Sequence, residues 1–225
     1  MSGTPGRESA GAPRASLHRN IRGRERELHR LANGVRRLIR YVTTNVASRE
    51  VTERAARDVE ALADALEPDL PDTPPGRYDL DGRPSDPHDF FPYDPVLGPF
   101  NPLALPVEMA WHPPKAIGRA TFDTPYEGPP GCVHGAILAA VFDQALNTAN
   151  LQEGCPGPTA SLTLEYLRPT PLHRELVFEA WVEARDANKV FTHGQVSCDD
   201  RICVEARGLF IAIDFDRIQS LRADE

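Results

Sequence analysis

An acidic residue, Asp143, stands inside a run of small and apolar residues that extends from His134 to Asn150. A loop rich in Gly and Pro precedes this run, and no helix breaker interrupts it, so the pattern predicts a loop that leads into a buried helix. A carboxylate is costly to bury unless it is paired or hydrogen-bonded. Asp143 is therefore a candidate catalytic group. It could also be an ordinary acid at a solvent-facing seam or one bonded to a neighbouring strand.

The junction between this loop and the helix is the second place where the residues favour chemistry. Backbone N–H groups at a helix N-terminus, with the helix dipole behind them, stabilise negative charge that develops on a carbonyl oxygen under attack by water. His134 and Gly135 occupy this junction. The stretch thus combines a helix N-terminus that can stabilise negative charge with an acid that needs a partner or a function.

The cysteines do not suggest a metal or redox centre. Cys132, Cys155, Cys198 and Cys203 form no CxxC pair and have no matching His cluster. Such spacing supports neither a zinc site nor a thiol–disulfide motif. We expect reduced thiols and neither a metal nor a cofactor.

Charge divides the chain into a basic head and an acidic body. Residues 1–57 contain 13 Arg and 5 acidic residues, a net charge of +8, whereas residues 58–225 carry −16. No stretch reaches the roughly 18 consecutive apolar residues of a membrane span, and the first fifteen residues have no apolar core of a signal peptide. We therefore expect a cytoplasmic protein.

The N-terminal part is predicted to be helical. Residues 1–16 are polar and rich in Gly, Pro and Arg, which favours disorder. From Leu17 to Val46 the apolar residues recur at helical spacing, and a second helix is expected from about Val51 to Leu66, with Val59, Leu62 and Leu66 facing inward. An Arg-rich amphipathic helix can lie on a membrane, touch nucleic acid, or dock on its own protein or a partner subunit.

The remainder divides into a connector and a second structural part. Prolines punctuate residues 68–106, between aromatic residues that suggest a strap across the surface. Alternating patterns then predict strands at residues 107–111, 116–123, 159–168, 175–184, 190–197 and 202–213, with the apolar helix after the second. One antiparallel sheet wrapped around one central helix, an α+β architecture, satisfies this order. The domains expected are 1–67 (tail and helical extension), 68–106 (connector) and 107–225.

This order of elements resembles the hotdog-fold acyl-CoA thioesterases, over about residues 101–215. The resemblance rests on Gly131-Cys-Val-His134-Gly135-Ala136 before the helix, on the strand that begins at Thr159, and on the closing strand from Glu205 to Ile211. Within that family the chain looks most like the phenylacetate-pathway (PaaI-type) subgroup with a His-Gly-Gly signature. The second glycine of that signature is Ala136 here.

The resemblance implies a role for each site residue. Gly135 would supply the backbone N–H that binds the thioester oxygen, Asp143 would be the general base or nucleophile, and Thr159, from the partner subunit, would hold the attacking water. His134 could act as a base, but in the family it mainly holds the turn. Helical spacing, and not the resemblance, makes Asn147 a candidate to orient Asp143, since it lies one turn beyond on the same face. The implied activity is hydrolysis of an acyl-CoA thioester in fatty acid metabolism.

A single chain cannot complete this site by simple adjacency. Asp143 lies nine residues beyond His134, or about 13 Å along a helix. We therefore expect a homodimer or a dimer of dimers with sites at the dimer interface. Coenzyme A phosphates need cations, for which Lys189, Arg168 and Arg174 are the candidates, with Arg207 as a further basic residue.

Two other functions fit parts of the sequence. An acyl-CoA-binding regulator would use the basic head to bind DNA, but a helix-turn-helix needs short helices, and a sensor needs no acid at position 143. A hotdog hydratase would need a His four or five residues after the acid, and none follows before His173. We rank the regulator second, the hydratase third, and nucleic acid as an improbable partner.

Overall fold

The structure, a computed structural model, describes residues 18, 20–72 and 86–213. The tail expected to be disordered, residues 1–16, lies outside them, as do residues 214–225 at the end of the third predicted domain. Two long helices, α1 (Glu25–Thr44) and α2 (Arg49–Leu66), come first, and a 3₁₀ turn, η1 (Glu67–Asp69), ends α2 at Pro68. A short helix, α3 (Pro87–Phe90), follows within the connector.

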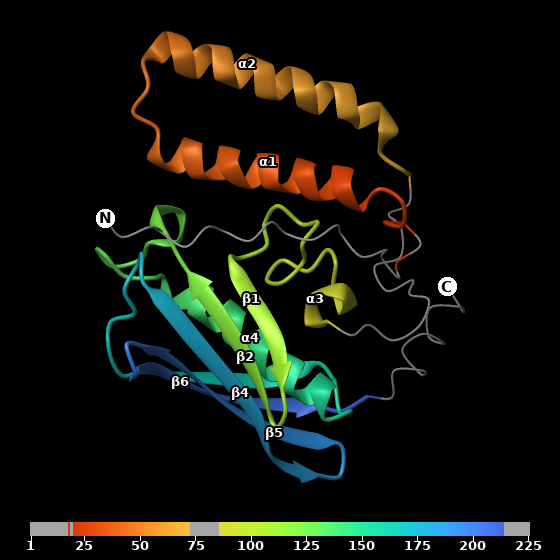
Figure 1. The fold of residues 1–225 in the computed structure, drawn as a ribbon, viewed down its shortest axis with the longest axis vertical. Helices are drawn as coiled ribbons and strands as arrows, with labels where there is room; N and C mark the ends of the chain where they lie inside the picture. The colour runs from red at the N-terminus through yellow and green to blue at the C-terminus, as the bar shows by residue number, and fades with distance from the viewer. Residues whose placement is uncertain (1–17, 19, 73–85, 214–225) are drawn as a thin grey trace, which may run out of the picture.

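A sheet and one long helix form the rest. The strands are β1 (Val107–His112), β2 (Lys115–Thr121), β3 (Thr159–Tyr166), β4 (Glu175–Asp186), β5 (Lys189–Cys198) and β6 (Arg201–Ile211). Between β2 and β3 come a 3₁₀ turn, η2 (Thr124–Tyr126), and the helix α4 (Gly135–Gln152). The six strands are antiparallel in the order β1-β2-β4-β5-β6-β3, and Figure 1 shows them curving around α4. The predicted α+β hotdog fold is confirmed, and each predicted strand lies within a few residues of its place.

The core lies between α4 and the concave face of the sheet. Phe142 of α4 meets Phe178 of β4 edge to face, with ring centroids 5.5 Å apart. Both rings are fully buried, as are Phe122 and Phe210. Burying such aromatic side chains supplies a large apolar contact area and fixes the helix against the strands. This packing sets the position of Asp143 relative to the sheet.

The N-terminal helices differ from the expectation in two ways. Helix α1 begins at Glu25 and not at Leu17, because residues before it form a turn in which Gly23 takes a positive φ of 82°. Ile21 is nevertheless fully buried, which explains why the apolar spacing continues through the turn. Val59, Leu62 and Leu66, expected to face inward, are exposed, and α2 has no buried residue.

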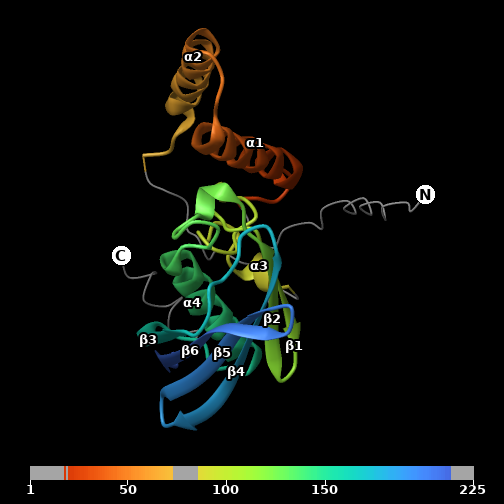
Figure 2. The same ribbon diagram turned by 90° about the vertical axis from the view of Figure 1, so that its left-hand side faces the viewer.

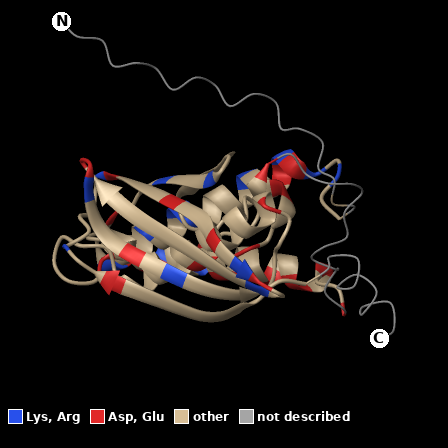
Figure 3. Cartoon of the chain, turned by 90° about the horizontal axis from the view of Figure 1, so that it is seen from below, with Lys and Arg blue, Asp and Glu red and all other residues tan. Residues whose placement is uncertain are grey.

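Charged residues of both signs are interspersed along the strands (Figure 3). One example joins three strands. Glu179 of β4 accepts hydrogen bonds from Lys115 of β2, at 2.9 Å, and from Gln195 of β5, at 2.6 Å. The Lys115 ammonium also lies 5.0 Å from the centre of the Trp181 ring, which itself stacks on His193. The contact with Lys115 holds the pKa of Glu179 below its usual range.

Candidate active site

The loop before α4 is held on both sides by backbone hydrogen bonds. His134 N donates to the Tyr126 carbonyl at 2.9 Å, and Val133 N donates to the Thr170 carbonyl at 2.9 Å. The Glu127 carboxylate accepts from Gly131 N at 2.7 Å, where the backbone has a φ of 73° that favours glycine. These hydrogen bonds therefore hold the Gly- and Pro-rich loop in one conformation where it leads into α4.

His134 is the N-cap of α4. Its Nδ1 accepts a hydrogen bond from Ala136 N at 3.0 Å, so the ring satisfies one of the N–H groups that a helix leaves without an intrahelical partner. Gly135 N has no acceptor among the described residues. Ala136 is exposed, so its methyl group does not separate α4 from the sheet. Replacing the second glycine of the signature thus leaves a free N–H at Gly135.

Tyr166, at the end of β3, closes the N-terminus of α4 from the other side. Its hydroxyl donates to the Gly135 carbonyl at 3.0 Å, and a Cβ added at Gly135 would lie 3.0 Å from the same hydroxyl oxygen. That approach is tighter than most side chains tolerate, which explains a glycine here. Tyr166 is not among the site residues that the sequence predicts. Only the tertiary fold brings it to Gly135.

Asp143 lies at the opposite end of β3. Its Oδ1 accepts a hydrogen bond from the Thr159 hydroxyl at 2.6 Å, within the same chain. The expectation that the hydroxyl beside Asp143 comes from a partner subunit therefore does not describe this contact. Asp143 is partly exposed. With Oδ1 held by Thr159, its other carboxylate oxygen is the one available to a water molecule.

A β-bulge brings Thr159 to Asp143. Thr159 is opposite Phe210 of β6, and Ser161 is opposite Leu209, so Ala160 is an extra residue on β3. Strict alternation would place Thr159 on the outer face with Ser161. The bulge instead turns it to the inner face, which is the face of the buried Phe210 and of α4. Nothing in the local sequence signals this irregularity.

The other predicted residues divide between the two ends of β3. Lys189 begins β5 opposite Ile211, near the Thr159 end, and is exposed. Arg168, which follows the Tyr166 end, donates to the Ile202 carbonyl at 2.7 Å, and Arg174 pairs with Asp199. These two arginines are exposed but already engaged. The structure therefore does not bring the three cations together in one chain.

Asn147 follows Asp143 by one turn of α4, and the two side chains do not form a hydrogen bond with each other. Its Oδ1 is buried and has no hydrogen-bond partner in the described part of the chain. Deeper in α4, Asn150 is fully buried and accepts from the Thr192 hydroxyl at 2.5 Å. Within the described residues, His, Cys, Asp and Glu form no cluster of three that could hold a metal ion.

The described residues include two kinds of group that water attack on a carbonyl requires. They offer a carboxylate fixed by a hydroxyl at one end of β3, and a free N–H at a helix N-terminus at the other. These two ends of the strand are too far apart to act on one carbonyl within one chain. In the described sheet β3 is an edge strand, with exposed residues along most of its length.

Comparisons with known proteins match this region. The profile of the thioesterase superfamily matches residues 130–205. A Xenopus laevis protein, acyl-coenzyme A thioesterase THEM4, is 37% identical over 93 residues, which are 40% of this chain and 41% of that protein. The match thus spans about two fifths of the relative's length.

Solved structures extend the likeness beyond this segment. A crystal structure described as a thioesterase superfamily protein has 31% sequence identity and a TM-score of 0.73, covering 82% of this chain and 90% of that one. The Escherichia coli PaaI protein from the phenylacetic acid degradation operon has 18% identity and a TM-score of 0.46, covering 49% and 81%. That value does not separate one subgroup from another, so the PaaI-type assignment stays a prediction.

Proposed function

The chain belongs to the thioesterase superfamily, and from that premise we propose that it hydrolyses an acyl-coenzyme A thioester to a free acid and coenzyme A. The observation that carries the proposal is the 2.6 Å hydrogen bond between Thr159 and Asp143. A short bond of this kind fixes a carboxylate in one orientation. A fixed carboxylate on a partly exposed helix face suits a catalytic base.

In the proposed reaction Asp143 is the general base. It removes a proton from water as the water oxygen attacks the thioester carbonyl carbon, and negative charge develops on the carbonyl oxygen. Collapse of the tetrahedral intermediate breaks the C–S bond, and the coenzyme A sulfur leaves and takes up a proton. Base catalysis of this kind contributes about 100- to 10,000-fold. Thr159 acts through Asp143, as a positioning residue.

Asp143 could alternatively attack the carbonyl itself and form an anhydride, which water then opens. The two routes differ in where the oxygen from solvent first appears. A single turnover in ¹⁸O-labelled water transfers label to Asp143 if water opens the anhydride at the enzyme carbon, whereas general-base catalysis leaves Asp143 unlabelled. The hydrogen bond to Oδ1 does not distinguish the two routes, because it lowers the basicity of the carboxylate together with its nucleophilicity.

The oxyanion donor in this proposal is the Gly135 N–H of a second copy. Asp143 and Gly135 of one chain lie at opposite ends of β3, so two chains whose β3 edges run antiparallel would bring each base to the other's donor. Removing a single oxyanion donor costs about 100- to 1,000-fold in rate. Dimerisation through this edge would thus be a condition for activity. Lys189, Arg168 and Arg174 are the proposed contacts for the coenzyme A phosphates.

The alternative of a DNA-binding regulator is not favoured. The described N-terminal residues form two long helices joined by four residues, and α2 contains five acids against three arginines. That pattern differs from the compact helices of a helix-turn-helix, and an acidic helix does not suit a phosphate backbone. Among the described helices, none has the length and apolar character needed to cross a membrane.

A thiol-release assay with acetyl, medium-chain, long-chain and aromatic acyl-CoAs tests the proposal. We expect hydrolysis of at least one of them, and a loss of about 100-fold or more in kcat for Asp143→Asn. The asparagine can still accept a hydrogen bond from Thr159, so the fold should survive. Asp186→Asn, in the exposed β4–β5 hairpin, is the matched control. If the wild type hydrolysed none of these substrates, the proposed enzyme class would be wrong. If Asp143→Asn remained fully active, the assignment of Asp143 as the base would be wrong.

A further inference from the structure

Helices α1 and α2 each present an apolar face that no other described residue fully covers. Helix α2 contains no buried residue, although its apolar residues recur at helical spacing. The α2 stripe comprises Val51, Val59, Leu62 and Leu66, each exposed by 44–50%. The α1 stripe comprises Leu31, Leu38, Ile39 and Val42, with Val42 exposed by 78%.

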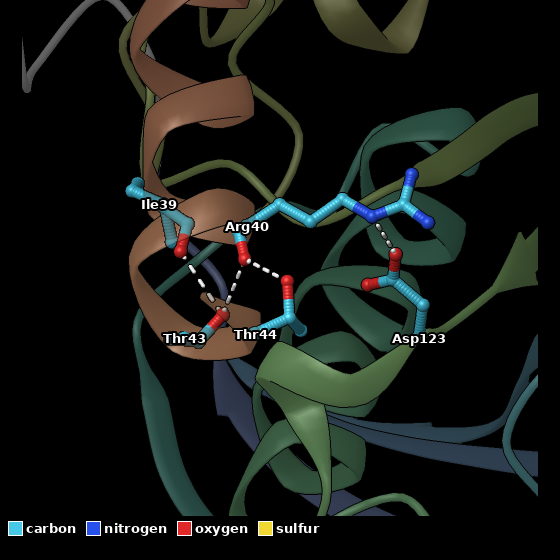
Figure 4. A network of polar contacts seen from close by, with 5 residues as sticks. All are labelled: Ile39, Arg40, Thr43, Thr44 and Asp123. Atoms are coloured by element: carbon cyan, nitrogen blue, oxygen red, sulfur yellow. Dashed lines mark hydrogen bonds and ion pairs between the residues drawn. The ribbon is translucent and has the colours of Figure 1, made fainter. Parts of the chain in front are cut away.

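The contacts that hold α1 on the protein leave its stripe free. Arg36 donates to three carbonyl oxygens of one loop, those of Gly98, Pro99 and Asn101, at 2.6 to 3.2 Å. One turn later, Arg40 pairs with Asp123 at 3.0 Å (Figure 4). Ala32, one turn before Arg36, is the residue of α1 that is buried. These polar contacts therefore fix α1 on the protein, and its apolar stripe remains available to pack against another surface.

Helix α2 has still fewer contacts. Figure 2 shows it on the far side of α1 from the sheet, and among the described elements only η1, its own continuation, packs on it substantially. Isolated helices of this length are marginal in water, and most helical stability in proteins comes from packing an amphipathic face. Helix α2, with 18 residues and no buried residue, therefore has an apolar face that is free to pack on another surface.

The net charges of α1 and α2 indicate what packs on them. Helix α1 carries five arginines and two glutamates, a net charge of +3, and α2 carries three arginines and five acids, a net charge of −2. Each helix is thus complementary to the other in charge and matched to it in apolar character. An anionic membrane or a nucleic acid would attract α1 but repel α2. A second copy of the chain offers both surfaces at once.

We propose that α1 and α2 form an interface between two copies of this chain, in which the α2 stripe of each copy packs on the α1 stripe of the other. Four helices then form a two-fold symmetric bundle with apolar residues inside and opposite charges facing each other at its rim. The short turn between the helices supports a fixed hairpin, since Ser48 caps α2 and the Asn45 side chain bonds to Ala47 N and Thr52. The proposal does not depend on thioester hydrolysis.

Cross-linking between differently tagged chains tests the interface directly. One full-length chain carries only Leu38→Cys, and the other carries only Leu62→Cys. After mixing and treatment with a short bismaleimide, we expect a mixed dimer that contains one chain of each kind. The partly exposed native Cys132 is controlled by unsubstituted chains treated in parallel. A chain that carries both substitutions tests the alternative, in which α2 packs on α1 of the same chain. If that chain forms only an intramolecular cross-link and the single variants form no mixed dimer, the proposal is overturned.

Sedimentation velocity supplies an independent measurement. Leu62→Glu places a charge in the α2 stripe, and Ala61→Glu places the same charge on the polar side of the same helix. We expect Leu62→Glu to weaken the association that the helices mediate by about 100-fold, since a two-fold interface contains the change twice, and Ala61→Glu to change it less than about threefold. Neither variant should affect association through the β3 edge. High salt should weaken wild-type association, because the rim charges are screened. Equal effects of the two variants would refute the interface. Circular dichroism verifies that both fold.

Discussion

The pair formed by Asp143 and Thr159 illustrates what a hydrogen bond would add to the carboxylate that we propose as the catalytic base. The hydroxyl cannot act as a base, but it restricts the carboxylate to one orientation and occupies one of its oxygens. Removing such a bond leaves the carboxylate in place and frees it to rotate. Its effect should therefore appear in the chemical step and hardly at all in substrate binding.

We predict that Thr159→Val lowers kcat by about 10-fold, which corresponds to the lower end of the roughly 1.5 to 3 kcal/mol that a hydrogen bond to a charged group contributes. KM should stay within about twofold, because Thr159 acts through Asp143 and not on the substrate. Thr159→Ser keeps the hydroxyl and should recover most of kcat. Steady-state kinetics on all three proteins decides the matter. A serine variant as slow as the valine variant would point to a role for the threonine methyl group in packing.

Glu179 gives a prediction about pH and stability. Its pKa is lowered chiefly by the hydrogen bond from Lys115, with Gln195 adding to it and burial opposing it. Because the pKa in the folded chain is below that of the unfolded chain, the contribution to stability is complete above about pH 4.3 and is lost as the pH falls through the folded value. Glu179→Gln should therefore lower stability by up to about 1 kcal/mol at pH 7 and by almost nothing near pH 3. Urea unfolding at both pH values measures this. An equal loss at both would show that packing, and not charge, explains the effect.

Sequence patterns alone could identify Asp143 but not its partner. An acid in an apolar helix is visible in any such pattern, because burial of an unpaired charge is costly. Only the family resemblance indicates a role for Thr159, because alternation in its strand assigns it to the outer face with Ser161. The role of Tyr166 at Gly135 was equally hidden. Tyr166 and Gly135 are separated by 31 positions in the sequence. Contacts between residues so far apart depend on strand pairing that local patterns do not specify.

At the scale of elements, the site depends on how closely β3 approaches β6. The segment before β3 continues the pairing, as Ile211 N donates to the Pro158 carbonyl and Ile213 N to the Pro156 carbonyl. A Cβ added at Gly157 would lie 1.8 Å from the Ile211 carbonyl oxygen, so one of the two backbones must move. Glycine is thus needed two residues before Thr159, where the two segments touch.

We predict that Gly157→Ala displaces the start of β3 and with it the Thr159 hydroxyl. The change should destabilise the chain by about 1 to 3 kcal/mol, the usual cost of overpacking. It should also lower kcat by at least the amount that Thr159→Val does. Thermal unfolding and steady-state kinetics measure the two effects. Gly154→Ala is a useful comparison: no atom lies within 4 Å of the added Cβ, and its positive φ of 70° makes that substitution a test of backbone strain alone.

The elements were more predictable than their surroundings. Period-two patterns located every strand of the sheet to within a few residues, because side chains alternate between the two faces of a strand. The helical pattern of α2 was equally clear, but its apolar residues are exposed where burial was expected. An amphipathic pattern shows that a helix has a face to cover. It does not show what covers that face, since the same pattern serves a core, a partner or a lipid surface.

At the scale of the whole molecule, a layer of polar contacts joins the helical hairpin to the rest of the chain. The Arg36 guanidinium reaches a single loop, residues 98–101, through three carbonyl oxygens. Burial lowers the pKa of Arg36, with a weaker opposing contribution from Tyr126. Cutting this one anchor should loosen the hairpin without disturbing the core between α4 and the sheet.

We predict that Arg36→Met leaves the protection of α4 amides in hydrogen exchange unchanged and increases exchange in α1 by about 10-fold. That factor is what losing about 1.4 kcal/mol of local stability would produce. Exchange resolved by mass spectrometry on peptides from both helices measures it. Arg37→Met, one residue away and exposed, serves as the control and should change neither. Increased exchange in α4 would mean that the hairpin and the core open as one unit.

The bulge at Ala160 means that a count of residues, and not a side chain, determines which way Thr159 faces. No single substitution at Ala160 removes a functional group, so scanning that position with other amino acids would find it tolerant. Deleting Ala160 would be different. The strand would become regular, Thr159 would face outward, and the carboxylate on α4 would lose its hydroxyl while every functional residue remained in the chain. In this protein one insertion or deletion at an unremarkable position can abolish a site that most point mutations nearby would spare.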